Sequence, residues 1–198
     1  MTSIIVKFGG SFFSDKTAKT GVIRQDNLVR LATIVTELRK EAEVQLVFGA
    51  GSFGHGLADV LGLKTDAFTK VSERDLAPLE ASLRELKQLI TACLPPDLEI
   101  HFAGLEKRGE QVRIISGDEI IVNLVHKTTP QTIIFYGDVK GVIAGGKLYK
   151  ELRTSDLPQI IATLEEVESD KIDVTGAMRG KLIQLSKLKS PTIIKFRT

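Results

Sequence analysis

The sequence predicts an α/β protein, a three-layer αβα sandwich in which helices cover both faces of a mostly parallel central sheet. Short apolar strands alternate with amphipathic helices along the chain, which is the pattern of a parallel sheet. Two of these strands run directly into glycine loops, and ligands bind at such strand ends in this class of sheet. The 198 residues suffice for one domain with its own core, so we expect a single domain over residues 1–198.

The elements of the N-terminal half follow from hydrophobic periodicity. Apolar, β-branched residues predict a strand over residues 3–8, and one apolar face predicts a helix over residues 26–42. A second buried strand over residues 44–48 leads into the longer glycine loop. The remaining elements expected here are a helix after Ser52, a helix over residues 72–90 with Ser72 and Asp75 in a capping box, and strands over residues 98–103 and 112–115.

The C-terminal half repeats the alternation of helix and strand. Ser116-Gly117 opens a helix over residues 118–126, and an apolar strand over residues 132–136 precedes Gly137-Asp138. Glycines 145 and 146 predict the turn of a hairpin within residues 141–148. Helices over residues 155–164 and 175–188 and a last strand over residues 192–196 complete the expected elements.

Composition and charge exclude several classes of function. The chain is 42% hydrophobic and 26% charged with a net charge of +2, and its basic residues are spread out, so we expect no nucleic-acid partner. It contains no apolar run long enough to cross a bilayer, so we expect no membrane partner. The single Cys93 forms no internal disulfide and fits a reducing compartment. Because Met1 leads almost at once into the first strand, we expect a cytoplasmic protein without a signal peptide.

Two glycine loops carry the functional signal. Lys7-Phe-Gly-Gly-Ser11 follows the first strand, and Val47-Phe-Gly-Ala-Gly-Ser-Phe-Gly-His55 contains the second strand's end and the longer loop. Glycines let backbone N–H groups approach an anion, and a following helix adds its positive end. The alternative for each loop is that its glycines only permit a turn. Two such loops at strand ends indicate two phosphates meeting, which is the arrangement of a phosphoryl-transfer enzyme.

Five motifs in order resemble the amino-acid kinase superfamily, and most closely the isopentenyl phosphate kinases. They are Lys7-Phe-Gly-Gly-Ser11 with Asp15-Lys16, Gly49-Ala-Gly-Ser-Phe-Gly-His55, Ile115-Ser-Gly-Asp-Glu-Ile-Ile121, Phe135-Tyr-Gly-Asp-Val-Lys-Gly-Val142 and Asp173-Val-Thr-Gly-Ala-Met-Arg-Gly-Lys181. The resemblance implies transfer of the γ-phosphate of ATP onto a small phosphorylated acceptor, such as isopentenyl phosphate, to give a diphosphate. It also implies Mg²⁺ bridging the ATP phosphates rather than held by a protein metal site, a homodimer, an acceptor-binding half over about residues 1–110 and a nucleotide-binding half over about residues 111–198.

The resemblance implies a catalytic role for four residues. Lys7 would contact the transferred phosphate and Lys16 would stabilise the transition state, because phosphoryl transfer depends on placing two phosphates in line and neutralising their charge. His55, between a glycine loop and a helix, would bind the phosphate of the acceptor. Asp118 would keep the lysines charged and in place. The alternatives are that both lysines are solvated loop charges and that Asp118 caps its helix.

Further residues are expected to bind the two substrates. Ser11 and Ser52 have the alternative of capping the helices that follow them, and His101 and His126 are expected to be ordinary surface or core histidines. The residues expected to bind the nucleotide are Lys7, Gly9, Gly10, Ser11, Gly51, Asp138, Gly176, Ala177 and Lys181. The residues expected to bind the acceptor are Ala50, Gly51, Gly54, His55 and Gly117.

The chain also departs from the pattern of the family. Its interval from Gly56 to Ile115 is short and is expected to be mostly one helix, whereas the family has a longer segment there. Lys140 and Ala177 replace a carboxylate and a glycine of the family motifs, and the chain ends at Thr198 before the family's final strands. Two alternatives to the isopentenyl phosphate kinase activity therefore stay open: a non-catalytic member that binds nucleotide or anion, and a kinase for a phosphonate or another small acid.

Overall fold

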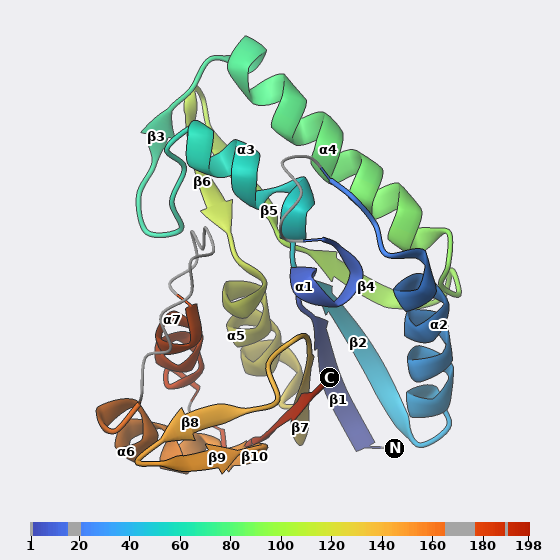
Figure 1. Ribbon diagram of the computed structural model, residues 1–198, viewed down its shortest axis with the longest axis vertical. Helices are drawn as coiled ribbons and strands as arrows, with labels where there is room; N and C mark the ends of the chain where they lie inside the picture. Colours follow the sequence, from blue (N-terminus) through green and yellow to red (C-terminus); the bar gives the residue numbers. More distant parts are fainter. Residues whose placement is uncertain (1, 16–20, 165–176, 189) are drawn as a thin grey trace.

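The central sheet has six strands in the order β10–β11–β7–β1–β2–β4 (Figure 1). The computed structural model describes residues 2–15, 21–164, 177–188 and 190–198. Neighbouring strands from β11 to β4 are parallel, and β10 is antiparallel to β11 at one edge. The strands are β1 Thr2–Phe8, β2 Ala42–Phe48, β4 Glu99–Phe102, β7 Thr132–Tyr136, β10 Glu151–Arg153 and β11 Ile193–Arg197. The mostly parallel sheet predicted from the sequence is confirmed.

Helices cover both faces of this sheet, because side chains alternate along each strand. On β1, Ile5 packs into a core with α5, α6 and α7, whereas Ile4 and Val6 pack into a second core with α1, α2 and the end of α4. The helices are α1 Gly10–Phe13, α2 Gln25–Arg39, α3 His55–Val60, α4 Glu73–Thr91, α5 Gly117–Thr128, α6 Leu157–Ala162 and α7 Ala177–Leu185. The predicted three-layer architecture is therefore confirmed.

A smaller antiparallel sheet of order β3–β6–β5 lies beyond the main sheet, in the upper part of Figure 1. Its strands are β3 Thr69–Lys70, β5 Gly104–Arg108 and β6 Gln111–Ile115. It packs with α3 and the first turns of α4 around an apolar cluster that includes Leu63, Leu79 and Val112. The expectation that the interval from Gly56 to Ile115 is mostly one helix is wrong, since four strands accompany α4 there. The sequence does not reveal β3 and β5 because they are short and carry charged, partly exposed side chains.

Several boundaries differ from the prediction. Helix α2 ends at Arg39, and Ala42 already begins β2. A 3₁₀ turn over Thr154–Asp156 precedes α6, so that helix is shorter than expected. The hairpin of β8 (Val142–Ala144) and β9 (Lys147–Tyr149) is confirmed, with φ of 54° at Gly145 and 72° at Gly146. Of the helix expected over residues 175–188, the structure describes α7, and residues 175 and 176 lie outside the described residues.

Serine caps fix the starts of two helices. Ser72 Oγ accepts a hydrogen bond from the backbone N–H of Asp75 at 3.2 Å, which confirms the serine half of the predicted capping box, while the Asp75 carboxylate accepts from the Ser72 hydroxyl at 2.6 Å. Ser116 Oγ accepts one from the backbone N–H of Glu119 at 3.1 Å and caps α5 in the same way. A side-chain acceptor at this position satisfies an N–H group that the helix leaves unpaired. The cap at Ser116 sets the direction in which the first turn of α5 leaves β6, and that turn carries Asp118.

Candidate active site

Lys7 lies near the carboxyl end of β1, and the alternation of the strand sets the direction of its side chain. It is two residues after Ile5, so it points to the face of the sheet that α5 and α7 cover. The side chain is only 9% exposed. Its Nζ donates a hydrogen bond of 2.7 Å to Oδ1 of Asp118, 111 residues further along the chain.

Asp118 receives a second lysine from α7. Nζ of Lys181 donates to both carboxylate oxygens of Asp118, at 2.9 Å and 3.0 Å. The face of Phe135 lies beneath both ammonium groups, with its ring centroid 5.8 Å from Nζ of Lys7 and 4.6 Å from Nζ of Lys181. We call Lys7, Asp118 and Lys181 the lysine cluster. Its members come from β1, α5 and α7, so the fold rather than local sequence brings them together.

Burial and charge explain the pKa values of this cluster. Burial lowers the pKa of Lys7 to about 8, although the charge of Asp118 opposes this change. Burial alone would raise the pKa of Asp118, but the charges of Lys181 and Lys7 and their hydrogen bonds outweigh it and hold this pKa well below its ordinary value. At neutral pH the carboxylate is therefore ionised, and Lys7 is mostly protonated but close to its titration.

Among the described residues, the lysine cluster has an excess of positive charge. Two ammonium groups share one carboxylate, and each ammonium has three N–H donors, so the hydrogen bonds to Asp118 leave donors to spare. A buried charge is costly unless a partner of opposite sign is present. An anion with several acceptor oxygens, such as a phosphate, would supply both the missing charge and the missing acceptors.

The two glycine loops touch each other through their backbones. A Cβ on Gly10 would lie 2.2 Å from Cα of Gly51, and a Cβ on Gly51 would lie 3.0 Å from Cα of Gly10. Gly51 also has φ of 55°, a conformation that side chains with a Cβ rarely adopt. Glycine is thus required at both positions for the loops to meet. The two glycine loops, each predicted to follow a strand, thus lie against each other at the ends of β1 and β2.

Two other glycines expected to bind the acceptor have a packing reason for lacking a side chain. A Cβ on Gly117 would lie 2.9 Å from Cε of Lys7, so Gly117 leaves room for that lysine. A Cβ on Gly54 would lie 2.5 Å from Cβ of Ala50, so Gly54 allows the turn after β2 to close. Close packing accounts for both glycines whether or not a ligand contacts them.

Ser11 and Ser52 join neighbouring loops, and neither caps a helix by its side chain. Ser11 Oγ accepts a hydrogen bond of 3.3 Å from the backbone N–H of Asp138, which connects the first glycine loop to the end of β7. Ser52 Oγ accepts one of 3.3 Å from the backbone N–H of Val22. The capping alternative for these two serines is therefore wrong. Gly9 is tied to the same strand end, since its N–H donates to the carbonyl oxygen of Tyr136 at 2.8 Å.

The other expected site residues are distributed as follows. His55 is the first residue of α3 and is partly buried, directly after the loop that contains Gly51. Asp138 follows β7, and its side chain is exposed. Ala177 begins α7, the helix of Lys181. Lys16 and Gly176 lie outside the described residues.

Phe135 was missed by the sequence reasoning. It is the register partner of Lys7 across the β1–β7 pair and is 6% exposed, so its ring forms part of the floor under the lysine cluster. A detectable signal existed, because an aromatic residue stands three positions before the expected nucleotide-binding Asp138 on a predicted buried strand. The alternative that Asp118 caps its helix is wrong, since Ser116 is the residue that caps α5.

The described residues contain neither a metal-binding group nor a helix that could span a membrane. In those ranges, no group of three or more His, Cys, Asp or Glu side chains could hold a metal ion. Across the same ranges, no helix is both long and apolar enough to cross a bilayer.

Comparisons with known proteins agree with the predicted resemblance, which is confirmed. The family described as the amino acid kinase family matches residues 2–94. An isopentenyl phosphate kinase of Methanocaldococcus jannaschii is 26% identical over 230 aligned positions, covering 93% of this chain and 87% of that protein. Another of Methanothermobacter thermautotrophicus is 24% identical over 232 positions, covering 92% of this chain and 85% of that protein. Both alignments are longer than this chain, so these relatives contain segments that it lacks.

A solved structure agrees at the level of the fold. The crystal structure of an isopentenyl phosphate kinase substrate complex superposes with a TM-score of 0.67 at 17% identity, over 99% of this chain and 91% of that one.

Proposed function

We propose that this chain, which has the amino-acid-kinase fold, is an ATP-dependent small-molecule kinase that transfers the γ-phosphate of ATP to a phosphate monoester and so forms a diphosphate. Isopentenyl phosphate is the proposed acceptor, because the relatives reported above are named for it. The observation that carries the proposal is the lysine cluster, in which the ammonium groups of buried Lys7 and partly buried Lys181 face one buried carboxylate next to two glycine loops.

The chemistry asks little covalent work of the protein. An oxygen of the acceptor phosphate attacks the γ-phosphorus of ATP, a new P–O bond forms, and the bond to the β-phosphate oxygen breaks to release ADP. The acceptor phosphate is already ionised at neutral pH, so no general base is needed. Catalysis then consists of alignment and of charge neutralisation in a site that excludes water.

Each part of the site has a role in this proposal. Lys7 and Lys181 donate to the oxygens of the transferred phosphate, and Asp118 keeps both lysines charged and directed at it. The glycine loops supply backbone N–H groups, with the contact between Gly10 and Gly51 setting how closely two phosphates approach. His55 begins the helix after the second loop and binds the acceptor phosphate. Lys16 stabilises the transition state.

The two halves of the chain have different roles in the same proposal. Residues 1–110 hold the acceptor and residues 111–198 hold the nucleotide. The nucleotide-binding residues include Asp138, which is joined to the first glycine loop through Ser11. Magnesium ions would be bound by the phosphate oxygens of ATP, since Asp118 already accepts from two lysines and the described residues form no metal-binding group. Such an ion supplies further charge neutralisation when it is present.

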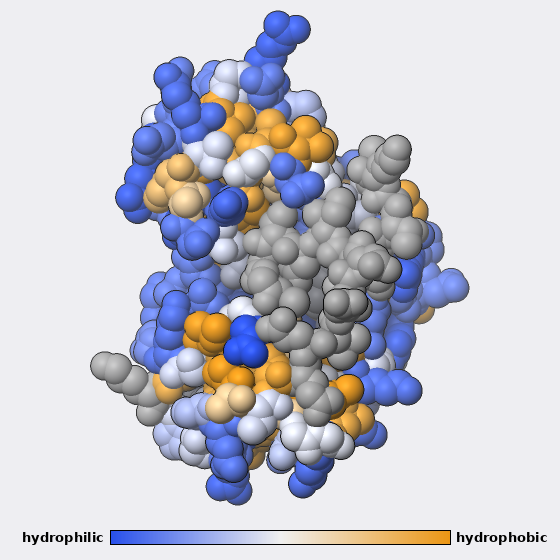
Figure 2. All heavy atoms as spheres, turned by 60° about the vertical axis from the view of Figure 1, so that its left-hand side comes forward, coloured by the Kyte–Doolittle hydropathy of each residue, from blue (hydrophilic) through white to orange (hydrophobic). Residues whose placement is uncertain are grey.

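We also propose that the protein is a homodimer that pairs through its N-terminal half. Val29 on α2 is 71% exposed and Val60 on α3 is 82% exposed, and both helices belong to that half. Figure 2 shows apolar atoms gathered in separate areas, one of them at the height of α3 and the three-stranded sheet. Light scattering coupled to size exclusion tests the proposal, with Val60→Glu expected to favour the monomer.

The activity is tested by ADP release from purified protein with magnesium and ATP. The acceptor panel contains isopentenyl phosphate, other small phosphate monoesters and phosphonates, and Lys7→Ala and His55→Ala are measured beside the natural chain. We expect turnover with isopentenyl phosphate that both variants lose. Turnover with a phosphonate and with no phosphate monoester would show that the acceptors are phosphonates. Nucleotide binding without turnover on any acceptor would contradict the kinase proposal and leave a nucleotide-binding protein.

A further inference from the structure

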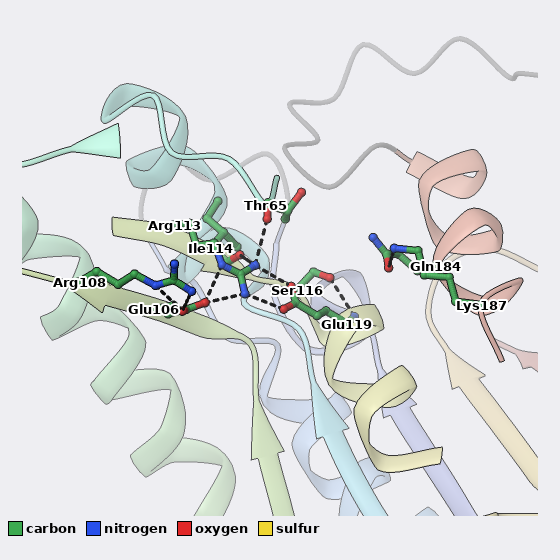
Figure 3. A network of polar contacts seen from close by, with 9 residues as sticks. All are labelled: Thr65, Glu106, Arg108, Arg113, Ile114, Ser116, Glu119, Gln184 and Lys187. Atoms are coloured by element: carbon green, nitrogen blue, oxygen red, sulfur yellow. Dashed lines mark hydrogen bonds and ion pairs between the residues drawn. The ribbon is translucent and has the colours of Figure 1, made fainter. Parts of the chain in front are cut away.

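We propose that Arg113 is a positioning residue that holds the first turn of α5, and with it Asp118, in a fixed place relative to Lys7. This inference rests on the kinase function proposed above. Figure 3 shows Arg113 at the centre of a group of polar contacts formed with Glu106, Arg108 and Glu119. We call these four residues the arginine network.

The guanidinium of Arg113 joins three separate elements. Nη1 and Nη2 donate to the two carboxylate oxygens of Glu119 on α5, at 3.0 Å and 2.8 Å. Nε donates to Glu106 on β5 at 2.6 Å, and Nη1 also donates to the carbonyl oxygen of Thr65 at 3.0 Å. The paired bonds to Glu119 fix direction as well as distance, because guanidinium and carboxylate are both planar. Arg113 therefore connects the three-stranded sheet to the helix that carries Asp118.

Glu119 connects Arg113 to the turn that carries Asp118. It follows Asp118 in the chain, and its own N–H is the group that donates to the cap at Ser116. Toward α7, Glu119 borders an open cleft of about 390 Å³ whose opposite side carries Gln184 and Lys187 (Figure 3). Among the described residues, the Glu119 side chain on this side of the turn is held by its two hydrogen bonds to Arg113, which supplement the backbone cap at Ser116.

The other end of the connection leads toward His55. The three-stranded sheet packs with α3 through the cluster that contains Ala58, Leu63 and Val112, and His55 is the first residue of α3. Arg113 thus links the element proposed to hold the acceptor to the helix that orients the lysines. A displacement of about 1 Å between reacting groups lowers the rate by as much as about 100-fold. Arg113 would limit such a displacement between the acceptor site and the lysines.

The chain offers a matched control in Arg108. This arginine belongs to the same network and bonds the same Glu106 at 2.8 Å, while its guanidinium stacks on Phe68 with 4.4 Å to the ring centroid. Its side chain is 66% exposed, and its partners lie on β5 and in the loop before β3. Arg108→Met removes a charge from the network but leaves the bonds between Arg113 and Glu119 in place.

Two readouts test the proposal on Arg113→Met, Arg113→Lys and Arg108→Met. The first is kcat with the acceptor that the natural chain uses. We expect Arg113→Met to lower it about 10- to 100-fold, Arg113→Lys to restore part of the loss, and Arg108→Met to stay within about twofold of the natural chain. The second is the titration of Lys7 Nζ by NMR without substrates, assigned with Lys7→Arg. Asp118 raises and Lys181 lowers the pKa of Lys7, so a displaced Asp118 lowers that pKa further in Arg113→Met.

The outcomes separate this proposal from the proposed function. If Arg113→Met only lowers the melting temperature while kcat and the Lys7 titration stay unchanged, Arg113 is merely structural. An equal loss in Arg108→Met overturns the proposal as well. If the natural chain turns over no acceptor, the kinase proposal fails, yet the Lys7 titration still decides whether Arg113 positions Asp118. Should Arg113→Met not fold, Glu119→Gln, which removes the charge of the partner and one of the two acceptor oxygens bonded by Arg113, gives the same comparison.

Discussion

The lysine cluster and the arginine network meet at two adjacent residues of α5, Asp118 and Glu119, and they differ in charge balance. In the lysine cluster two cations share one buried carboxylate, and within the described part of the chain an excess positive charge remains. In the arginine network two arginines alternate with two glutamates, all partly exposed to solvent, and the charges cancel. A balanced network needs nothing further and serves to hold elements together. An unbalanced cluster whose Lys7 and Asp118 are buried needs an anion, which is the property expected of a phosphate site.

The same difference shows in the pKa values. Hydrogen bonds to Glu119 and Glu106 raise the pKa of Arg113, so its charge is permanent at any physiological pH. Burial instead lowers the pKa of Lys7 to about 8, so its charge depends on its surroundings. The structural network keeps its charge fixed, whereas the proposed catalytic cluster has a charge that a ligand would change.

The largest effect is expected for Asp118→Asn, which removes the shared carboxylate and leaves buried Lys7 and partly buried Lys181 without this counter-charge. Breaking a buried ion pair by removing one partner costs about 3–5 kcal/mol of stability. We expect a loss of that size in urea unfolding at pH 7, together with loss of kinase activity. An Asp118→Asn protein as stable as the natural chain would show that the lysines do not depend on this carboxylate.

Lys7→Met is expected to separate activity from stability. The change leaves Lys181 and Asp118 as a balanced pair, so the free energy of unfolding should stay the same or increase. Activity should fall about 100-fold or more, because a donor to the transferred phosphate is lost. Both quantities can be measured on one preparation. A Lys7→Met protein that loses stability as well would indicate that Lys7 mainly supports the fold.

The pH dependence of kcat/KM is expected to report Lys7. Its pKa of about 8 in the folded protein implies a fall of about tenfold per pH unit above that value, since neutral Lys7 no longer attracts phosphate. The contribution of Lys7 to the free energy of unfolding should change in the opposite direction as the pH rises. Between about 8 and the ordinary value of 10.5 the unfolded chain binds more protons at Lys7, so this residue's contribution to stability rises with pH. In Lys7→Arg this alkaline limb should disappear from the rate profile.

The smallest effect is expected for Arg108→Met. Exposed ion pairs contribute about 0–1 kcal/mol, and this arginine is mostly exposed. The melting temperature of Arg108→Met should be slightly lower than that of the natural chain. Added salt should make this difference smaller, because it screens exposed ion pairs. A loss comparable to that of Asp118→Asn would mean that the two clusters are equally essential to the fold.

The sequence predicts much of the fold because the signals are local. The apolar runs of β1, β2 and β7, the cap at Ser72 and the hairpin glycines all lie within a few neighbouring residues. It also points to Lys7 and to the position of both glycine loops at strand ends, since strand ends in a parallel sheet share one edge. The strands β3 and β5 escape prediction because their charged side chains show no apolar alternation.

The contacts of the site are harder to predict, because they join residues distant in sequence. Nothing local to Ser11 indicates that its hydroxyl receives the N–H of Asp138, and local pattern favours the cap that is absent. Arg113 does leave a trace, as an arginine between Val112 and Ile114 in an otherwise apolar strand. Its pairing with Glu119 and Thr65 still depends on how the small sheet docks against α5.

The most direct test of the account is the titration of Lys7 Nζ by NMR with and without ATP. If a phosphate completes the lysine cluster, the added negative charge should raise the pKa of Lys7 well above its value of about 8 in the free protein. The shift should be absent with adenosine, which lacks phosphates. A pKa of Lys7 that stays the same while ATP is bound would contradict the account, because the nucleotide phosphates would then lie elsewhere.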